Sequence, residues 1–125
     1  MAKKILIIDD LGSLRYILSY DLKKAGYEAI EASSAEEGLK LAVSESPDLI
    51  IMDMMMPGLD GIQATKLLKK DEKTKDIPII MLTARSSRED VIDAVSSGIS
   101  HYIVKPYKFE KMYSKIVELI GEPNK

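Results

Sequence analysis

Five polar residues with the potential for chemistry each follow a short apolar run of the 125-residue sequence. They are two neighbouring acids, a third acid, a threonine and a lysine: Asp9, Asp10, Asp53, Thr83 and Lys105. Asp53 is the most informative, because it ends the apolar run LIIM and an isolated buried carboxylate is costly to keep ionised. Such an acid is expected only where a cation or hydrogen-bond donors compensate its charge.

Length and composition limit the class of protein. A chain of 125 residues, 46% of them hydrophobic, can form one compact core but not two. The net charge of -2, with acids and bases scattered, offers no basic surface for nucleic acid or for an anionic membrane. The sequence has no cysteine for disulfides or thiolate metal sites, and its start, MAKKILIIDD, does not have the pattern of a signal peptide. We expect a cytoplasmic protein with no direct nucleic-acid or membrane partner.

Short apolar runs alternate with longer segments whose apolar residues recur at helical spacing, which indicates a repeated strand–helix unit. The predicted strands are residues 5–8, 27–31, 48–52, 77–82 and 101–104. The first helix ends before Gly26 and is expected to bury Leu14, Ile17, Leu18, Leu22 and Ala25. The second helix is predicted to begin at a capping box formed by Ser34 and Glu37. The later helices are predicted over 61–70, from Ser86 or Ser87 to Gly98, and over 109–120.

Five such units call for a parallel sheet that is covered by helices on both faces, with right-handed crossovers. The predicted fold is therefore α/β, a doubly wound five-stranded parallel sheet. The strand order does not follow from the sequence, and we adopt the flavodoxin-like order 2-1-3-4-5 because it suits five units. One domain is expected over residues 1–121, followed by a short C-terminal tail at 122–125.

The polar residues all stand at the carboxyl ends of predicted strands, the edge where open α/β sheets bind ligands. The first and third strands flank the point where the order reverses, so their acids are expected to converge. Carboxylates about 5 Å apart repel by about 3 kcal/mol per pair at an effective dielectric of about 20, which favours a bound divalent cation. Oxygen ligands favour Mg2+.

Beside such a metal, Asp53 can act as a nucleophile, because carboxylates form acyl phosphates. Phosphoryl transfer needs mainly alignment of the reacting groups and neutralisation of the charge on the three equatorial oxygens. Lys105 offers a cation to one phosphoryl oxygen, Thr83 offers a hydroxyl to another, and the backbone amides after Asp53 serve the remainder. The sequence thus predicts a phosphoryl acceptor at Asp53.

From its first strand to its last helix, the chain resembles the receiver domain of two-component response regulators, in particular the chemotaxis-type single-domain receiver. The matching motifs occur in order: Asp9-Asp10, the block DMMMPGLDG at 53–61, Thr83-Ala84, and Lys105-Pro106 with Tyr102 ahead of it. The resemblance implies an aspartyl phosphate at Asp53, taken from a sensor histidine kinase or phosphotransfer protein. It also implies Mg2+ held by Asp10, Asp53 and the Met55 carbonyl with Asp9 assisting, and a cis bond before Pro106.

The same resemblance implies how the signal leaves the domain. Phosphorylation would shift an inactive–active equilibrium through Thr83 and Tyr102, and a downstream protein would bind the face of the fourth helix, fifth strand and fifth helix. We interpret the chain as a stand-alone response regulator that has only self-phosphorylation and self-dephosphorylation activity; an intermediate phosphocarrier in a phosphorelay is the alternative. In this family the positions two residues after the acceptor and two after the threonine overhang the site, and here they are Met55 and Arg85. Neither side chain orients water well, so we expect slow self-dephosphorylation.

Each motif alone has a plainer interpretation. Asp9-Asp10 can cap the next helix, Asp53 can belong to a turn before Pro57, and Thr83 can be an N-cap. We interpret Met54–Met56 as loop packing and His101 as a surface residue.

Two other functional classes remain as alternatives. An aspartate-nucleophile phosphatase uses Asp-x-Asp, but Met55 occupies the place of the second acid. A flavin binder needs a phosphate cradle rich in Ser, Thr and Gly after the first strand, where Asp10 instead places a charge that repels phosphate.

Overall fold

In the computed structural model of the protein, residues 2–123 are described, so the last two residues of the expected C-terminal tail lie outside the described residues. Five parallel strands form one sheet in the order β2-β1-β3-β4-β5, which confirms the predicted flavodoxin-like fold. The strands are β1 (Lys4–Ile8), β2 (Glu28–Ala32), β3 (Leu49–Met52), β4 (Ile79–Thr83) and β5 (His101–Val104). The helices are α1 (Gly12–Ala25), α2 (Ala35–Glu45), α3 (Gly61–Lys70), α4 (Arg88–Ser97) and α5 (Phe109–Ile120).

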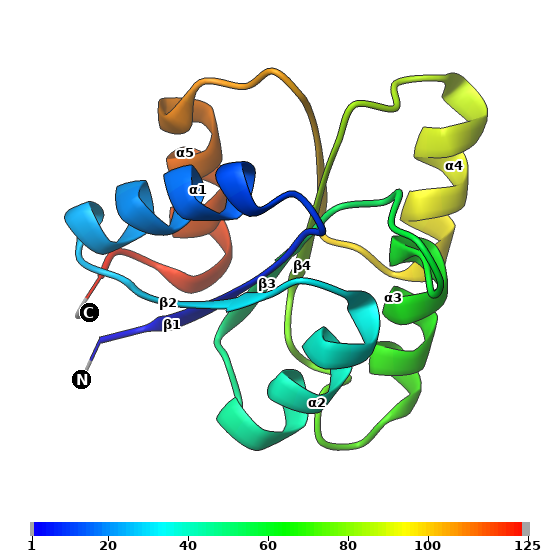
Figure 1. Ribbon diagram of the computed structural model, residues 1–125, viewed down its shortest axis with the longest axis horizontal. Coiled ribbons are helices and arrows are strands. Elements are labelled where there is room, and N and C mark those ends of the chain that lie inside the picture. The colour runs from blue at the N-terminus through cyan, green and yellow to red at the C-terminus, as the bar shows by residue number, and fades with distance from the viewer. Residues whose placement is uncertain (1, 124–125) are drawn as a thin grey trace.

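The helices form a layer on each face of the sheet: α1 and α5 cover one, and α2, α3 and α4 cover the other (Figure 1). Because side chains alternate along a strand, β1 serves both cores. Ile5 and Ile7 face the first layer, where the buried helix residues are Leu18, Leu22, Met112 and Ile116. Leu6 and Ile8 face the second layer, where the buried helix residues of the core cluster are Ala35, Ala42, Ala64 and Leu68. Burial on both faces explains why the central strands read as continuous apolar runs.

Two helix starts differ in detail from the sequence pattern. At α2 the Ser34 hydroxyl accepts the Glu37 N–H, but the Glu37 carboxylate accepts from the Ser33 N–H, so only half of the predicted capping box forms. At α3 a complete box, which the sequence analysis did not identify, joins Asp60 and Gln63. That box fixes where the chain enters α3 after the Asp53 segment.

Three sequence expectations are corrected by the packing. Ile17, expected in the core, is 59% exposed on α1. The fourth strand begins at Ile79, after Pro78, because proline has no N–H for the ladder; the Pro78 carbonyl still accepts the Ile50 N–H at 3.0 Å. His101 is half-buried and its ring contacts the carboxylate of Glu118 on α5, so it is not a simple surface residue.

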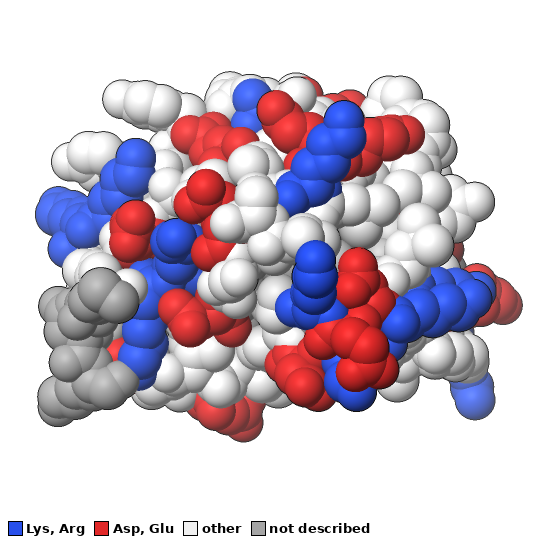
Figure 2. Space-filling view, turned by 90° about the horizontal axis from the view of Figure 1, so that it is seen from below, with Lys and Arg blue, Asp and Glu red and all other residues white. Residues whose placement is uncertain are grey.

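Charges are mixed over the surface. In the view of Figure 2, acidic and basic side chains are interspersed, and neither sign forms a continuous field. Within residues 2–123, none of the helices combines the length and the apolar character that crossing a membrane requires.

Candidate functional site

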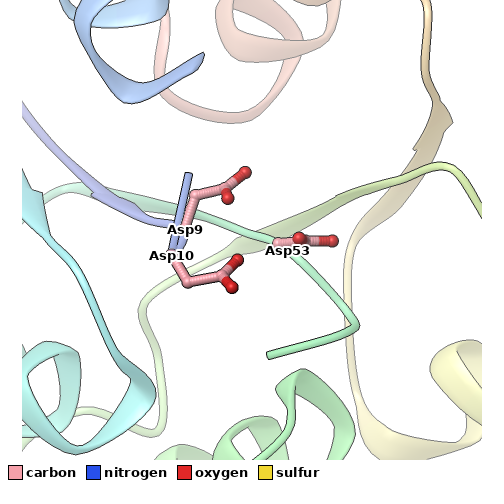
Figure 3. Close-up of side chains that lie close together, drawn as sticks. All are labelled: Asp9, Asp10 and Asp53. Atoms are coloured by element: carbon pink, nitrogen blue, oxygen red, sulfur yellow. The ribbon is translucent and has the colours of Figure 1, made fainter. Parts of the chain in front are cut away.

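Three acids converge at the carboxyl edge of the sheet. Asp9 follows β1 and Asp53 follows β3, and backbone hydrogen bonds hold both: Asp9 N–H to the Ala32 carbonyl at 3.1 Å and Asp53 N–H to the Ile8 carbonyl at 2.9 Å. Carboxylate oxygens of Asp9, Asp10 and Asp53 all lie within 4.8 Å of one another. Figure 3 shows the side chains extending into the same space from the ends of β1 and β3. The predicted convergence of the acids is present.

The backbone after Asp53 depends on a close approach by α3. The Gly61 N–H donates to the Met54 carbonyl at 2.9 Å. A Cβ at Gly61 would stand 2.5 Å from the Asp53 carbonyl oxygen and 2.8 Å from the Met54 Cα, both of them backbone atoms. The start of α3 therefore fixes the path of the segment that presents the Asp53 carboxylate, and only glycine fits there.

Lys105 supplies the positive charge of the site. It directly follows β5, where its N–H donates to the Thr83 carbonyl at 2.8 Å. Its Nζ lies 3.1 Å from Asp9 Oδ2 and 3.7 Å from Asp53 Oδ2, and its side chain is only 17% exposed. The Lys105–Pro106 bond is cis, as the family resemblance implied.

The site carries excess negative charge. Burial is the main cause that raises the pKa of Asp53, and the charge of Asp9 adds to it. Lys105 and the Met55 N–H, which donates to Asp53 Oδ1 at 3.4 Å, act in the opposite direction without cancelling the effect. A cation beside these acids would remove the repulsion and favour the ionised, nucleophilic form of Asp53.

The residues present fit Mg2+. The three carboxylates offer hard oxygen ligands at close quarters, while Asp10 is exposed, so water can reach the cluster and complete a coordination shell. Asp10 and Asp53, with Asp9 beside them, are the residues that would hold the ion. A bound ion would neutralise charge on the acceptor and on an incoming phosphoryl group.

Thr83 and Tyr102 are linked through the backbone of Arg85. Thr83 is 1% exposed and its Oγ1 accepts the Arg85 N–H at 3.2 Å. The Tyr102 hydroxyl donates to the Arg85 carbonyl at 2.6 Å and lies 3.8 Å from the Met54 sulfur. The two expected switch residues therefore share one intermediary, which sequence reasoning did not identify.

The side chains of Met55 and Arg85 differ from each other in their surroundings. Met55 is 51% exposed beside the acidic cluster, whereas Met54 and Met56 are buried, so the loop-packing interpretation holds for those two. The Arg85 guanidinium binds Asp90 in the first turn of α4, with Nε 2.9 Å from Oδ2 and Nη2 3.3 Å from Oδ1. Asp90 is a further residue that sequence reasoning missed, although the spacing Ser87-x-x-Asp90 resembles a capping box and could have drawn attention to it.

The helix-capping interpretations of Asp9-Asp10 and of Thr83 are not what the structure contains, whereas Asp53 does take part in a turn, since its Oδ1 accepts the Met55 N–H at 3.4 Å. The N-cap of α1 is Leu11, which makes no side-chain capping bond, and the Asp9 carboxylate accepts the Leu11 N–H at 2.9 Å, just ahead of the helix. The N-cap of α4 is Ser87, not Thr83. Neither Asp9-Asp10 nor Thr83 therefore serves as a helix N-cap.

Comparison with known proteins agrees with this geometry. The family model described as "Response regulator receiver domain" matches residues 5–117. The chain belongs to the response regulator receiver family. Among solved structures, chemotaxis protein CheY4 of Vibrio cholerae is similar to this receiver with a TM-score of 0.90 and 31% identity, over 95% of this chain and 99% of that one.

Curated relatives of the receiver are longer proteins. The phosphate regulon transcriptional regulatory protein PhoB of Pseudomonas aeruginosa is 39% identical over 116 residues, which are 93% of this chain and 51% of PhoB. The alkaline phosphatase synthesis transcriptional regulatory protein PhoP of Bacillus subtilis is 38% identical over 120 residues, 96% of this chain and 49% of PhoP. The chain spans about half the length of the curated relatives it matches.

Proposed function

We propose that this receiver accepts a phosphoryl group on Asp53 from the phosphohistidine of a sensor histidine kinase or a phosphotransfer protein, in a Mg2+-dependent reaction. The observation that carries the proposal is the convergence of Asp53 with two further acids and with Lys105 Nζ, 3.7 Å from its Oδ2. An acyl phosphate needs a nucleophilic carboxylate together with cations for the incoming phosphoryl oxygens, and this edge of the sheet brings both together.

Each residue has a role that follows from its position. An Asp53 oxygen forms the new bond to phosphorus while the phosphorus–nitrogen bond to the donor histidine breaks, and the imidazole keeps the electron pair. Lys105 pairs with one phosphoryl oxygen, and the Thr83 hydroxyl donates to another. The Met55 N–H already donates to Asp53 and lies on the segment that serves the remaining oxygen.

Signalling would occur by altered contact with another protein surface at α4, β5 and α5. Large apolar side chains are exposed there: Ile92 at 51%, Val95 at 57% and Val104 at 36%. Tyr102, on β5 and bonded to the loop before α4, joins this face to Thr83. A change at Thr83 therefore has a physical route to a surface that can bind a partner. A phosphocarrier that passes the group on would use the same site, so the phosphorelay remains the second candidate.

The acceptor is tested by intact-mass spectrometry with Mg2+ and a small acyl-phosphate donor. We expect the parent to gain one phosphoryl group and Asp53→Asn to gain none. Asp60→Asn is the matched control, because it alters an acid of the same loop that caps α3 and should leave labelling unchanged. Equal labelling of Asp53→Asn and the parent would exclude Asp53 as the acceptor.

The metal role is tested separately. Asp10→Ala should require more Mg2+ for the same labelling rate, since it removes a carboxylate ligand from the cluster. The measurement is the labelling rate across a Mg2+ titration. A rate equal to that of the parent at limiting Mg2+ would contradict a ligand role for Asp10.

The persistence of the signal is assigned to Met55. Its exposed side chain, two residues after Asp53, offers no acceptor to orient water, so we expect Met55→Asn to shorten the phosphoryl lifetime. A time course of phosphate release measures it, with Met55→Leu as the apolar control. An Asn variant that decays no faster than the Leu variant would remove this role.

A further inference from the structure

Three contacts, each with a different secondary-structure element, hold Arg85 in place. Its N–H donates to Thr83 Oγ1 at 3.2 Å, its carbonyl accepts the Tyr102 hydroxyl at 2.6 Å, and its guanidinium makes a two-point contact with Asp90. The first contact reaches the phosphoryl site, the second reaches β5, and the third reaches α4. The conformation of this one residue thus couples all three elements.

The Asp90 carboxylate is fixed in place. The Ser87 hydroxyl donates to Asp90 Oδ2 at 2.7 Å, and the Asp90 N–H donates back to Ser87 Oγ at 3.1 Å. Its side chain is 14% exposed, against 51% for Arg85. Because Ser87 already holds the Asp90 carboxylate in place, the Arg85 guanidinium binds an ordered partner. Such a contact is stronger than one between two mobile surface charges. The Arg85 and Ser87 hydrogen bonds also lower the pKa of Asp90, which keeps it charged at neutral pH.

These contacts resist the movement that phosphorylation requires. The Thr83 hydroxyl oxygen now accepts the Arg85 N–H, and a Thr83 that turned to donate to a phosphoryl oxygen would weaken that bond. The Arg85 backbone cannot follow freely while its side chain is paired with Asp90 and its carbonyl with Tyr102. An aspartyl phosphate also carries negative charge that competes with Asp90 for the guanidinium.

We propose that Asp90 is a positioning residue for the phosphoryl site: through its two-point contact it holds Arg85 toward α4 and so opposes the phosphorylated arrangement of the β4–α4 loop. This inference rests on the proposed phosphorylation of Asp53 and assigns the control of that state to a residue outside the acid cluster. Without the charge of Asp90, Arg85 is free to pair with the phosphoryl group and to cover the approach of water.

Removing that charge should stabilise the phosphorylated state. Asp90→Asn keeps the size of the side chain and can still accept from Ser87, but it loses the ion pair. We expect its phosphoryl lifetime to lengthen and its affinity for beryllofluoride, whose fluorines stand in for phosphoryl oxygens, to rise, each by about two- to fivefold, the range that a single exposed ion pair supports. Glu89→Gln, which removes a neighbouring charge from the same exposed helix turn, is the control and should match the parent.

The experiment is a double-variant cycle on phosphate release and beryllofluoride binding with the parent, Asp90→Asn, Arg85→Gln and the pair. If Asp90 acts through Arg85, then Asp90→Asn has no further effect once Arg85 is glutamine. An equal effect in both backgrounds, or an equal effect of Glu89→Gln, would show a merely structural or general charge effect on α4 and overturn the inference.

The same measurements separate this inference from the function on which it rests. A parent that gains no phosphoryl group and binds no beryllofluoride overturns the proposed function and the inference together. A parent that is labelled normally, with an Asp90→Asn variant that decays at the same rate, overturns the inference alone.

Discussion

At the scale of single residues, the acid cluster of the proposed acceptor site lowers the stability of the fold. Asp53 lies within 4.8 Å of two other acids with its side chain only 11% exposed, so its charge destabilises the fold at neutral pH, offset in part by Lys105. We expect Asp53→Asn to raise the free energy of unfolding by about 1 kcal/mol at pH 7 without Mg2+, a modest value because the cluster is open to water at Asp10. Urea unfolding measures the difference.

The pH dependence of this gain has a definite sign. Burial and the charge of Asp9 raise the pKa of Asp53, so the parent is stabilised where Asp53 is protonated and loses that contribution as pH rises through the raised pKa. The advantage of Asp53→Asn should therefore shrink as pH falls from 7 toward 4. Added Mg2+ should stabilise the parent more than the variant. The exposed Asp93→Asn is the control, and a gain equal to that of Asp53→Asn would contradict the argument.

At the scale of elements, the contact between the start of α3 and the end of β3 positions Asp53, the proposed acceptor. A Cβ at Gly61 would meet the Asp53 carbonyl oxygen at 2.5 Å, and backbone cannot yield as a flexible side chain can. We expect Gly61→Ala to lower the free energy of unfolding by about 1–3 kcal/mol. The variant should also be phosphorylated more slowly, because the added methyl group would displace the backbone segment that carries Asp53.

Another helical glycine provides the matched control. A Cβ at Gly12, the first residue of α1, would find its nearest neighbour, Arg15 Nη2, at 3.6 Å, an ordinary contact. Gly12→Ala should leave stability unchanged or raise it by about 0.5 kcal/mol, since alanine restricts the unfolded chain. Chemical denaturation and labelling rates of both variants decide the matter. A Gly61→Ala variant as stable and as rapidly labelled as Gly12→Ala would refute the role of the close approach.

At the scale of the whole molecule, the layer of α1 and α5 is joined to the sheet by buried tyrosine. The Tyr27 hydroxyl donates to the Gly121 carbonyl at 2.8 Å, beyond the end of α5, and its ring lies 6.3 Å from that of Tyr113. Burial raises the pKa of Tyr27 from 10.0 to about 12, with Tyr113 and Glu122 adding to the shift. Burial likewise raises the pKa of Tyr107 to about 12.

These shifts predict how the fold responds to alkali. A raised pKa means that the neutral phenol is favoured by the fold, so its stabilising contribution is complete below pH 10 and is lost as pH rises toward 12. We expect tyrosine absorbance to titrate with a late component near pH 12, which Tyr27→Phe and Tyr107→Phe each reduce. Tyr16→Phe, at a side chain 69% exposed, is the control. A late component that survives both Tyr27→Phe and Tyr107→Phe would contradict the assignment.

The sequence by itself determined the elements and which polar residues stand at the ends of the strands. Apolar runs and helical spacing are local properties, so the β5 range and the α3 range were predicted as they occur, and the acids stood at strand ends before any packing was known. The alternation of strands and helices along the sequence predicts a parallel sheet, and the carboxyl ends of all parallel strands lie at one edge. The position of Asp53, Thr83 and Lys105 at that edge follows from this alone. The strand order was adopted for its suitability to five units rather than derived.

The tertiary structure decided the contacts that depend on several elements at once. Whether Ile17 is buried depends on what packs beside α1, and the partner of Arg85 depends on how the β4–α4 loop turns toward the first turn of the next helix. The close approach of Gly61 to the Asp53 backbone depends on where α3 begins relative to β3. Sequence spacing reports periodicity within one element, whereas these features are set by the distances between elements, which only packing fixes.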